Sequence, residues 1–251
     1  MQTQPQTQPQ NRPEMILFDY GHTLVYESGF NILRGINAVM ARATANPRNL
    51  TAEEINSYAQ TYLADFGPQF FAANVELHEW QYQRLLYESL QISFDITPAE
   101  LERLFWYNAS PGAVVPGAQE MLAYLKESGI RTGVVSNLMF SGQALQQRLN
   151  RLLPDNDFEF IITSSEYLVK KPSPLLFNLA LSKANLPKEA VWHCGHSPEV
   201  DVQGAANAGI FPIWFRYTAI ENPRLEQLME APSCPHRLIH HWSELIDLLE
   251  D

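Results

Sequence analysis

Short apolar runs, each ending at a polar or glycine residue, recur along the chain and predict the strands of a buried sheet. The clearest is Met15 to Phe18, which stops at Asp19. Continuous apolar runs of this length are typical of strands covered on both faces, as in a parallel sheet. Similar runs cover 133–135, 158–162 and 190–194. A further run, 210–215, contains Pro212 and is predicted at an edge of the sheet, because proline cannot donate a ladder hydrogen bond.

Amphipathic stretches alternate with these runs and predict helices. They cover 116–128, 143–153, 200–208 and 241–249. Ser173 and Pro174 predict one more helix start, as an N-cap followed by proline at the first helical position. Strands and helices that alternate in this way favour right-handed βαβ units. The sequence therefore predicts an α/β fold with a Rossmann-like parallel sheet flanked by helices.

The stretch 31–108 departs from this alternation, because it contains no convincing strand. Its amphipathic segments are 31–43, 51–66, 74–90 and 97–107. The last begins with Thr97-Pro98-Ala99-Glu100, a capping-box pattern. A helical block after the first strand predicts an inserted all-helical cap domain. The expected divisions are a disordered polar tail over 1–13, a core over 14–27 and 111–251, and a cap over 28–110.

Composition and charge narrow the class of protein. The 251 residues are 45% hydrophobic, which is enough for a substantial core, and 17 Lys+Arg against 28 Asp+Glu give a net charge of −11. Such a charge disfavours nucleic acid and anionic membranes as partners. Cys194 and Cys234 form no CxxC pair, which favours a reducing compartment. With no long apolar run and no secretory pattern in 1–13, we expect a cytoplasmic protein with a small, anionic substrate.

Polar residues follow the predicted strands at the positions where open α/β sheets bind ligands. They are Asp19 with its neighbours up to Leu24, then Ser136 and Asn137, then Lys170 and Lys171 before Pro172, and finally Gly195, His196 and Ser197 with Asp201. Four loops would thus bring carboxylates, a hydroxyl and an ammonium group to one pocket.

This constellation, spread over 15–215, resembles the haloacid dehalogenase (HAD)-like hydrolase superfamily with a helical cap of the C1 type. The resemblance implies that Asp19 is a nucleophile that forms an aspartyl-phosphate, and that Thr23 is its partner in the first motif. It implies that Ser136 and the backbone N–H of Asn137 hold the transferring phosphoryl group. Lys171 would lower the pKa of the nucleophile and neutralise phosphoryl oxygens.

The same resemblance implies a Mg²⁺ ion held by Asp19, the backbone carbonyl of Gly21 and Asp201. Two positions depart from the family pattern. Gly21 stands where phosphatases of the family have an aspartate that protonates the leaving alcohol. His196 stands where an aspartate commonly binds the metal, and imidazole suits other metals better than Mg²⁺.

Several features leave alternatives open. His22 and His196 could form an altered proton relay in one pocket or be polar fillers. Lys170 competes with Lys171 for the catalytic position. A zinc site at His193 to His196 is not expected, because His193 and Cys194 point to opposite faces of a strand. The aromatic residues of the cap could line a cleft or form its core; they are Trp80, Tyr82, Phe105, Trp106 and Tyr107.

The leading hypothesis is a hydrolase of a small phosphorylated metabolite acting through Asp19. A HAD-fold binding or regulatory protein with little catalysis is the second, since two carboxylates are missing. The third is a metal-free 2-haloacid dehalogenase, a branch of the family that also lacks the acid at Gly21. Phe177 fits that branch less well, because its members tend to have tyrosine there.

Overall fold

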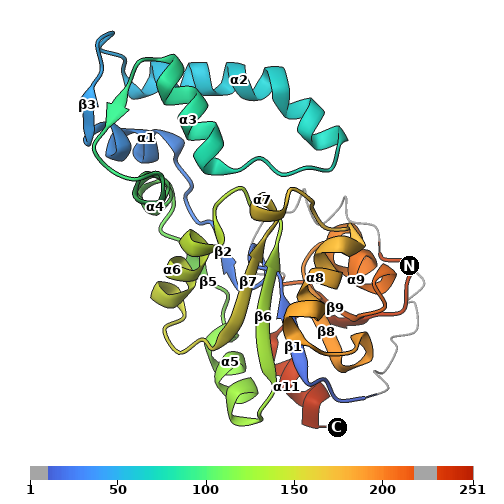
Figure 1. Cartoon of the computed structure of the whole chain (residues 1–251). Coiled ribbons are helices and arrows are strands. Elements are labelled where there is room, and N and C mark those ends of the chain that lie inside the picture. The colour runs from blue at the N-terminus through green and yellow to red at the C-terminus, as the bar shows by residue number, and fades with distance from the viewer. Residues whose placement is uncertain (1–10, 218–230, 251) are drawn as a thin grey trace.

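A computed structural model of the chain describes residues 11–217 and 231–250, and a six-stranded sheet forms its centre (Figure 1). The strands lie in the order β10-β9-β8-β1-β6-β7, and every neighbouring pair is parallel. Their bounds are β1 Met15–Phe18, β6 Arg131–Ser136, β7 Phe158–Thr163, β8 Val191–Gly195, β9 Phe211–Phe215 and β10 Arg237–Ile239. The predicted α/β fold with a parallel sheet is confirmed.

Helices cover both faces of this sheet. One face packs against α5 (Ala118–Glu127), α6 (Gly142–Leu152) and α11 (Trp242–Glu250), and the other against α8 (Pro174–Ala184) and α9 (Gly204–Asn207). In β1, Ile16 and Phe18 enter the first hydrophobic cluster, whereas Met15 and Leu17 enter the second. All four side chains are fully buried. This is why the strand is continuously apolar rather than alternating.

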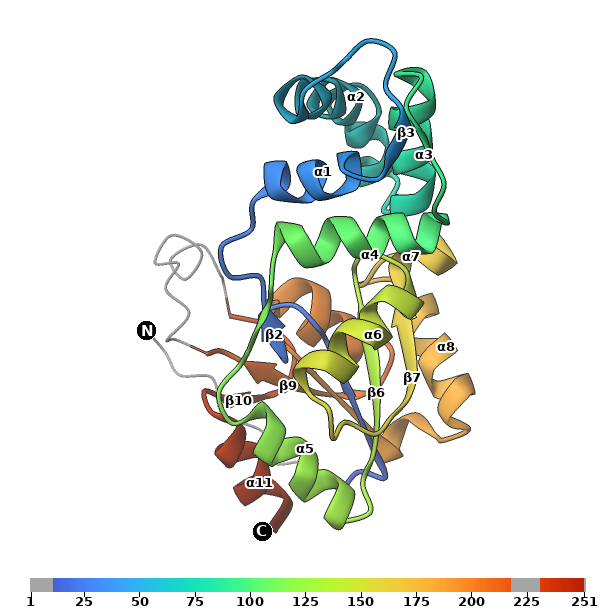
Figure 2. The same ribbon diagram turned by 90° about the vertical axis from the view of Figure 1, so that its left-hand side faces the viewer.

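Four helices lie together above the carboxyl ends of the strands (Figures 1 and 2). They are α1 (Ile32–Met40), α2 (Ala52–Ala72), α3 (Glu79–Ser89) and α4 (Pro98–Ala109). The capping box predicted at Thr97 is present at the start of α4. The chain leaves and re-enters the core through β2 (Val25–Tyr26) and β5 (Ala113–Val114), which pair antiparallel. The assignment of 28–110 to a separate C1-type cap domain stays a prediction.

The expectation of an all-helical block without strands is wrong in one detail. β3 (Ala43–Ala45) and β4 (Ser93–Phe94) pair antiparallel as a two-stranded sheet. β3 follows α1 and β4 follows α3. Because these two connections run side by side, a few of their backbone N–H and C=O groups form hydrogen bonds with one another. A strand of two or three residues is too short to leave an alternating pattern in the sequence.

The predicted edge position of 210–215 is also wrong. β10 pairs in parallel with β9 and forms the edge of the sheet instead. The pairing with β10 covers only Ile213 to Phe215, so the missing N–H of Pro212 lies outside it. The helix predicted over 200–208 begins earlier, as a π-helical segment η2 (Pro198–Gln203) that leads into α9.

Two short segments complete the described fold. α7 (Ser164–Tyr167) follows β7, and the 3₁₀ turn η1 (Lys188–Ala190) precedes β8. Most of the tail predicted over 1–13 lies outside the described residues. Where the chain is described, none of its helices combines the length and apolar character needed to cross a membrane.

Candidate active site

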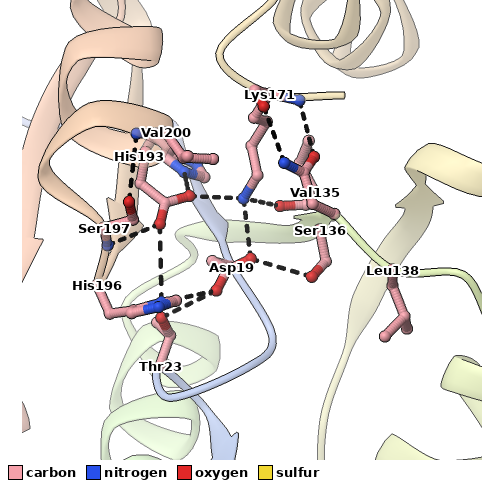
Figure 3. A network of polar contacts seen from close by, with 12 residues as sticks. Asp19, Thr23, Val135, Ser136, Leu138, Lys171, His193, His196, Ser197 and Val200 are labelled. Carbon is pink, nitrogen blue, oxygen red and sulfur yellow. Dashed lines mark hydrogen bonds and ion pairs between the residues drawn. The ribbon is translucent and has the colours of Figure 1, made fainter. Parts of the chain in front are cut away.

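The candidate site forms where three neighbouring strands end. β1 lies between β6 and β8, and their carboxyl ends meet at one edge of the sheet. Asp19 directly follows β1, Ser136 is the last residue of β6, and His196 directly follows β8. Lys171 comes from the loop before α8 and Asp201 from η2. Figure 3 shows the side chains of Ser136, Lys171 and His196 converging on Asp19. The parallel topology therefore brings together most of the residues that the sequence predicted.

Asp19 accepts hydrogen bonds on both carboxylate oxygens. Its Oδ1 accepts from Ser136 Oγ at 3.0 Å and from Lys171 Nζ at 2.9 Å. Its Oδ2 accepts from Thr23 Oγ1 at 3.3 Å and from His196 Nδ1 at 3.2 Å. The residue is only 5% exposed. Its carboxylate is thus held in one orientation by four donors.

Lys171 rather than Lys170 reaches this carboxylate. The Nζ of Lys171 donates to Asp19 at 2.9 Å, to Asp201 Oδ1 at 2.6 Å and to the Val135 carbonyl at 2.7 Å. An ammonium group has three N–H donors, so all of them are used. Lys170 points elsewhere, with its Nζ 3.5 Å from Glu76. Of the two lysines, Lys171 is therefore the one that contacts Asp19, and its catalytic role stays a prediction.

Asn137 lies in the site in a way that the sequence did not indicate. Its side-chain Nδ2 donates to the Lys171 carbonyl at 2.8 Å, and its Oδ1 accepts from the Lys171 N–H at 2.7 Å. The amide therefore fixes the backbone that carries the lysine. The role expected for the backbone N–H of Asn137, on a phosphoryl group, stays a prediction.

Sequence reasoning missed His193 as part of the site. Its Nε2 lies 3.2 Å from Asp201 Oδ1, and it must carry the hydrogen because an ionised carboxylate can only accept. Its Nδ1 has no hydrogen-bond partner among the described residues. The imidazole is fully buried and packs edge-on against Phe177. The period-2 alternation of β8, which places His193 opposite Cys194, was the available signal.

The charges of the site favour the ionised forms of four of its side chains. Burial alone would raise the pKa of Asp19 and of Asp201, but the charge of Lys171, together with the neighbouring histidines, lowers both. Burial would lower the pKa of Lys171, and the two carboxylates reverse this effect and raise it. Burial would also lower the pKa of His196, but its hydrogen bond to Asp19 and the charge of that carboxylate raise it. Burial lowers the pKa of His193, which favours its neutral form.

Gly21 and His196, the two positions that depart from the family pattern, lie at the exposed side of the site, next to His22. A Cβ added to Gly21 would have no atom within 4 Å. His22 has a φ of 54° and is exposed, and the centroid of its ring lies 5.3 Å from that of His196. The two imidazoles are therefore neighbours, as a shared pocket requires.

The residues that could hold a metal do not match Mg²⁺ in chemistry. Ligand atoms of Asp19, His196 and Asp201 lie within 4.8 Å of one another. Mg²⁺ demands a near-ideal octahedron of oxygen ligands, whereas imidazole nitrogen suits zinc, copper, iron or nickel. Here one of three groups is an imidazole, and both carboxylates already accept from Lys171. This donor set does not fit Mg²⁺.

Three of the aromatic residues predicted for the cap have contacts that decide between a core and a cleft. Trp106 is 1% exposed, and its ring stacks on Phe140 with centroids 4.1 Å apart. Tyr82 is buried and donates to the Ala59 carbonyl, and Trp80 donates from Nε1 to Glu102 at 2.7 Å. For Trp106 and Tyr82 the packing interpretation is confirmed, whereas Trp80 is half-buried and lines a cavity within the helical block.

Comparison with known proteins agrees with this geometry. The family model described as haloacid dehalogenase-like hydrolase matches residues 13–209. The chain belongs to this family. The matched range of this HAD-like hydrolase includes β1, β6 and β8 and the loops that carry Asp19, Ser136, Lys171 and Asp201.

Relatives of this HAD-like hydrolase carry phosphatase names. It is 35% identical over 105 residues to glyceraldehyde 3-phosphate phosphatase of Pyrococcus abyssi, a match over 41% of this chain and 42% of that protein. The similarity thus spans about two fifths of that relative's length. It is 28% identical over 234 residues to phosphoglycolate phosphatase of Cereibacter sphaeroides, covering 93% of this chain and 96% of that one.

A solved structure shows the same fold. The 2-haloacid dehalogenase of Pseudomonas syringae pv. Tomato DC3000 superposes with a TM-score of 0.63 at 20% identity. The superposition covers 95% of this chain and 98% of the dehalogenase. At this identity the likeness establishes the arrangement of elements and not the reaction.

Proposed function

We propose that this hydrolase cleaves a phosphate monoester of a small metabolite through an aspartyl-phosphate on Asp19. The observation that carries the proposal is the buried Lys171 ammonium, which donates to both Asp19 and Asp201 while Ser136 donates to Asp19. A carboxylate with a lowered pKa beside a fixed cation is suited to attack a phosphoryl group and to stabilise its charge. The phosphatase names of the relatives support the same reaction class.

The proposed reaction has two displacement steps. A carboxylate oxygen of Asp19 attacks phosphorus, the bond from phosphorus to the ester oxygen breaks, and the alcohol leaves with one proton. Water then attacks the phosphorus of the aspartyl-phosphate, the bond to Asp19 breaks, and inorganic phosphate leaves. Lys171 and the Ser136 hydroxyl would stay within reach of the phosphoryl oxygens in both steps, because both already contact the attacking carboxylate.

The proton for the leaving alcohol cannot come from residue 21, since Gly21 has no side chain. In the proposed mechanism an imidazole supplies it, and His196 and His22 are the candidates at the exposed side of the site. A proton donor that is less well placed than a carboxylic acid would favour esters with good leaving groups.

The Asp19→Asn variant tests the proposal. We expect hydrolysis across a panel of phosphate esters to fall by at least about 100-fold, because the amide keeps the shape of the site but cannot attack. Acid quenching followed by mass spectrometry should find phosphate on the peptide containing Asp19 in the wild type only. Asp65→Asn, an exposed position in α2, is the matched control and should change neither.

Two results would contradict this function. Turnover of Asp19→Asn within about tenfold of the wild type would exclude covalent catalysis by this residue. A wild type that binds phosphate esters but hydrolyses none of them would favour the binding or regulatory alternative.

Metal-free dehalogenation of a 2-haloacid is a second candidate, favoured by one observation. Gly21 leaves no carboxylic acid beside Asp19, and loss of halide needs no proton. In that reaction a carboxylate oxygen of Asp19 displaces halide from carbon, and water then cleaves the resulting ester. Chloride release from 2-chloropropionate without any phosphatase activity would favour this candidate over the first.

A further inference from the structure

The imidazole of His196 lies between the two carboxylates of the site. Its Nδ1 is 3.2 Å from Asp19 Oδ2 and 3.8 Å from Asp201 Oδ2 (Figure 3). The side chain is 31% exposed, so it forms the boundary between the buried carboxylates and the outside of the site. A cation that bridges the two carboxylates would compete for the same position.

All four carboxylate oxygens are already satisfied by donors of the chain. Both oxygens of Asp19 accept from two donors each, as described above. Asp201 Oδ1 accepts from Lys171 and from His193, and its Oδ2 accepts from the backbone N–H of Ser197 at 2.9 Å. A buried carboxylate with these hydrogen-bond donors does not require a metal ion to satisfy its oxygens.

Two contacts fix the backbone around His196. The indole Nε1 of Trp214 donates to the His196 carbonyl at 3.0 Å. On the preceding residue, a Cβ added to Gly195 would lie 2.3 Å from Asp201 Cγ, so Asp201 packs directly on this backbone. The position of the imidazole is therefore set by the fold and not by the reach of a flexible loop.

We propose that the Nδ1–H of His196 takes the place of the divalent cation, so that the Asp19 site works without a bound metal. The proposal rests on Asp19 being the nucleophile. With a substrate bound, Lys171, Ser136 and His196 would be the donors within reach of the phosphoryl oxygens. These fixed donors supply the stabilisation of developing charge that a metal would otherwise supply.

Metal binding tests the proposal without relying on turnover. We expect the wild type to show no heat of binding when Mg²⁺ is titrated into the EDTA-treated protein, and no rise in melting temperature with Mg²⁺. His196→Asp adds an oxygen ligand at the same place and should bind Mg²⁺ at least about tenfold more tightly than the wild type. His196→Asn has the size of aspartate without its charge, and it should not bind Mg²⁺ more tightly.

Activity is the second readout. Hydrolysis by the wild type should stay within about twofold when EDTA replaces Mg²⁺, whereas any activity of His196→Asp should require Mg²⁺. Either of two results would overturn the proposal. One is a wild type that retains about one divalent ion per chain after dialysis, or binds Mg²⁺ as tightly as His196→Asp. The other is EDTA-sensitive activity restored by Mg²⁺, Co²⁺, Ni²⁺ or Zn²⁺. A wild type that hydrolyses no ester would defeat the proposed function, while the titrations would still decide whether His196 excludes the metal.

Discussion

Two glycines of the site stand there for different reasons. At Gly195 an added Cβ would collide with Asp201, and glycine is required by packing. At Gly21 an added Cβ would meet open space, and the residue does not have the left-handed backbone that favours glycine. The absence of a side chain at Gly21 is therefore a chemical feature of the site and not a constraint of the fold.

Gly21→Asp should add a general acid at this open position. We expect turnover of an alkyl phosphate, whose leaving group is poor, to rise by about tenfold, less than the roughly 100-fold or more that a fully oriented acid contributes. Turnover of p-nitrophenyl phosphate should change much less, because its leaving group departs without a proton. Gly21→Asn has the same size but no acidic proton and should leave the ratio of the two rates unchanged. An equal change for both substrates would contradict a role in acid catalysis.

At the level of elements, two buried glutamates join helices α3 and α4 to the loop after β6. Glu102 Oε1 accepts from the Ser141 N–H and its Oε2 from the Ser141 hydroxyl, both at 2.6 Å. The backbone N–H of Glu79 donates to the Met139 carbonyl at 2.9 Å. The Glu79 carboxyl, 3% exposed, accepts from Gln83 Nε2. Burial, together with the charge of Glu102, raises the pKa of Glu79 to about 8.

This shift predicts that the protein becomes less stable as the pH rises between about 4.5 and about 8. In that range the folded protein keeps a proton on Glu79 that the unfolded chain has already released. The free energy of unfolding of Glu79→Gln, which does not titrate, should therefore rise relative to the wild type by about 3 kcal/mol from pH 5 to pH 7.5. Urea denaturation at the two pH values measures this difference. Glu88→Gln, an exposed change in the same helix, should show no such trend.

At the level of the whole molecule, one buried arginine ties the two chain segments that connect 28–110 to the rest. Arg148 in α6 donates from Nη2 to Glu27 at 2.6 Å and from Nη1 to the Ser110 carbonyl at 3.1 Å. Its Nε donates to the Tyr20 hydroxyl at 2.7 Å, and its guanidinium lies over the Trp106 ring. Fully buried, it links the outgoing and the returning segment to the core.

Arg148→Met should therefore loosen both connections at once. We expect the free energy of unfolding to fall by about 3 kcal/mol, because removal of one partner leaves Glu27 and the Ser110 carbonyl without their charged donor. Hydrogen exchange should increase at 27–31 and 109–112, while β1 and β6 stay protected. Arg84→Met, at an exposed arginine of α3, is the control. Faster exchange throughout the sheet, in place of the local increase, would contradict a specific role in these connections.

Much of this architecture was predictable, because its signals are local. Apolar runs such as Met15 to Phe18 mark strands that are buried on both faces, and Thr97 begins a helix through contacts with its own neighbours. The parallel sheet, its flanking helices and the convergence of Asp19, Ser136 and Lys171 follow from such signals and from the order of the strands. Pairings between distant short segments leave no local signal, which is why β3 with β4 and the edge position of β10 were missed.

The sequence by itself therefore determined which chemical groups the loops carry: a carboxylate and a hydroxyl at strand ends and an ammonium group in the loop before α8, with a glycine and a histidine where the family has acids. Only the tertiary structure decided how they share hydrogen bonds. Packing across three strands and η2 brings Lys171, and not Lys170, into contact with Asp19. The same packing brings His193 to Asp201 and places His196 between the two carboxylates. The physical reason is that distance and desolvation govern these contacts, and both depend on elements far apart along the chain.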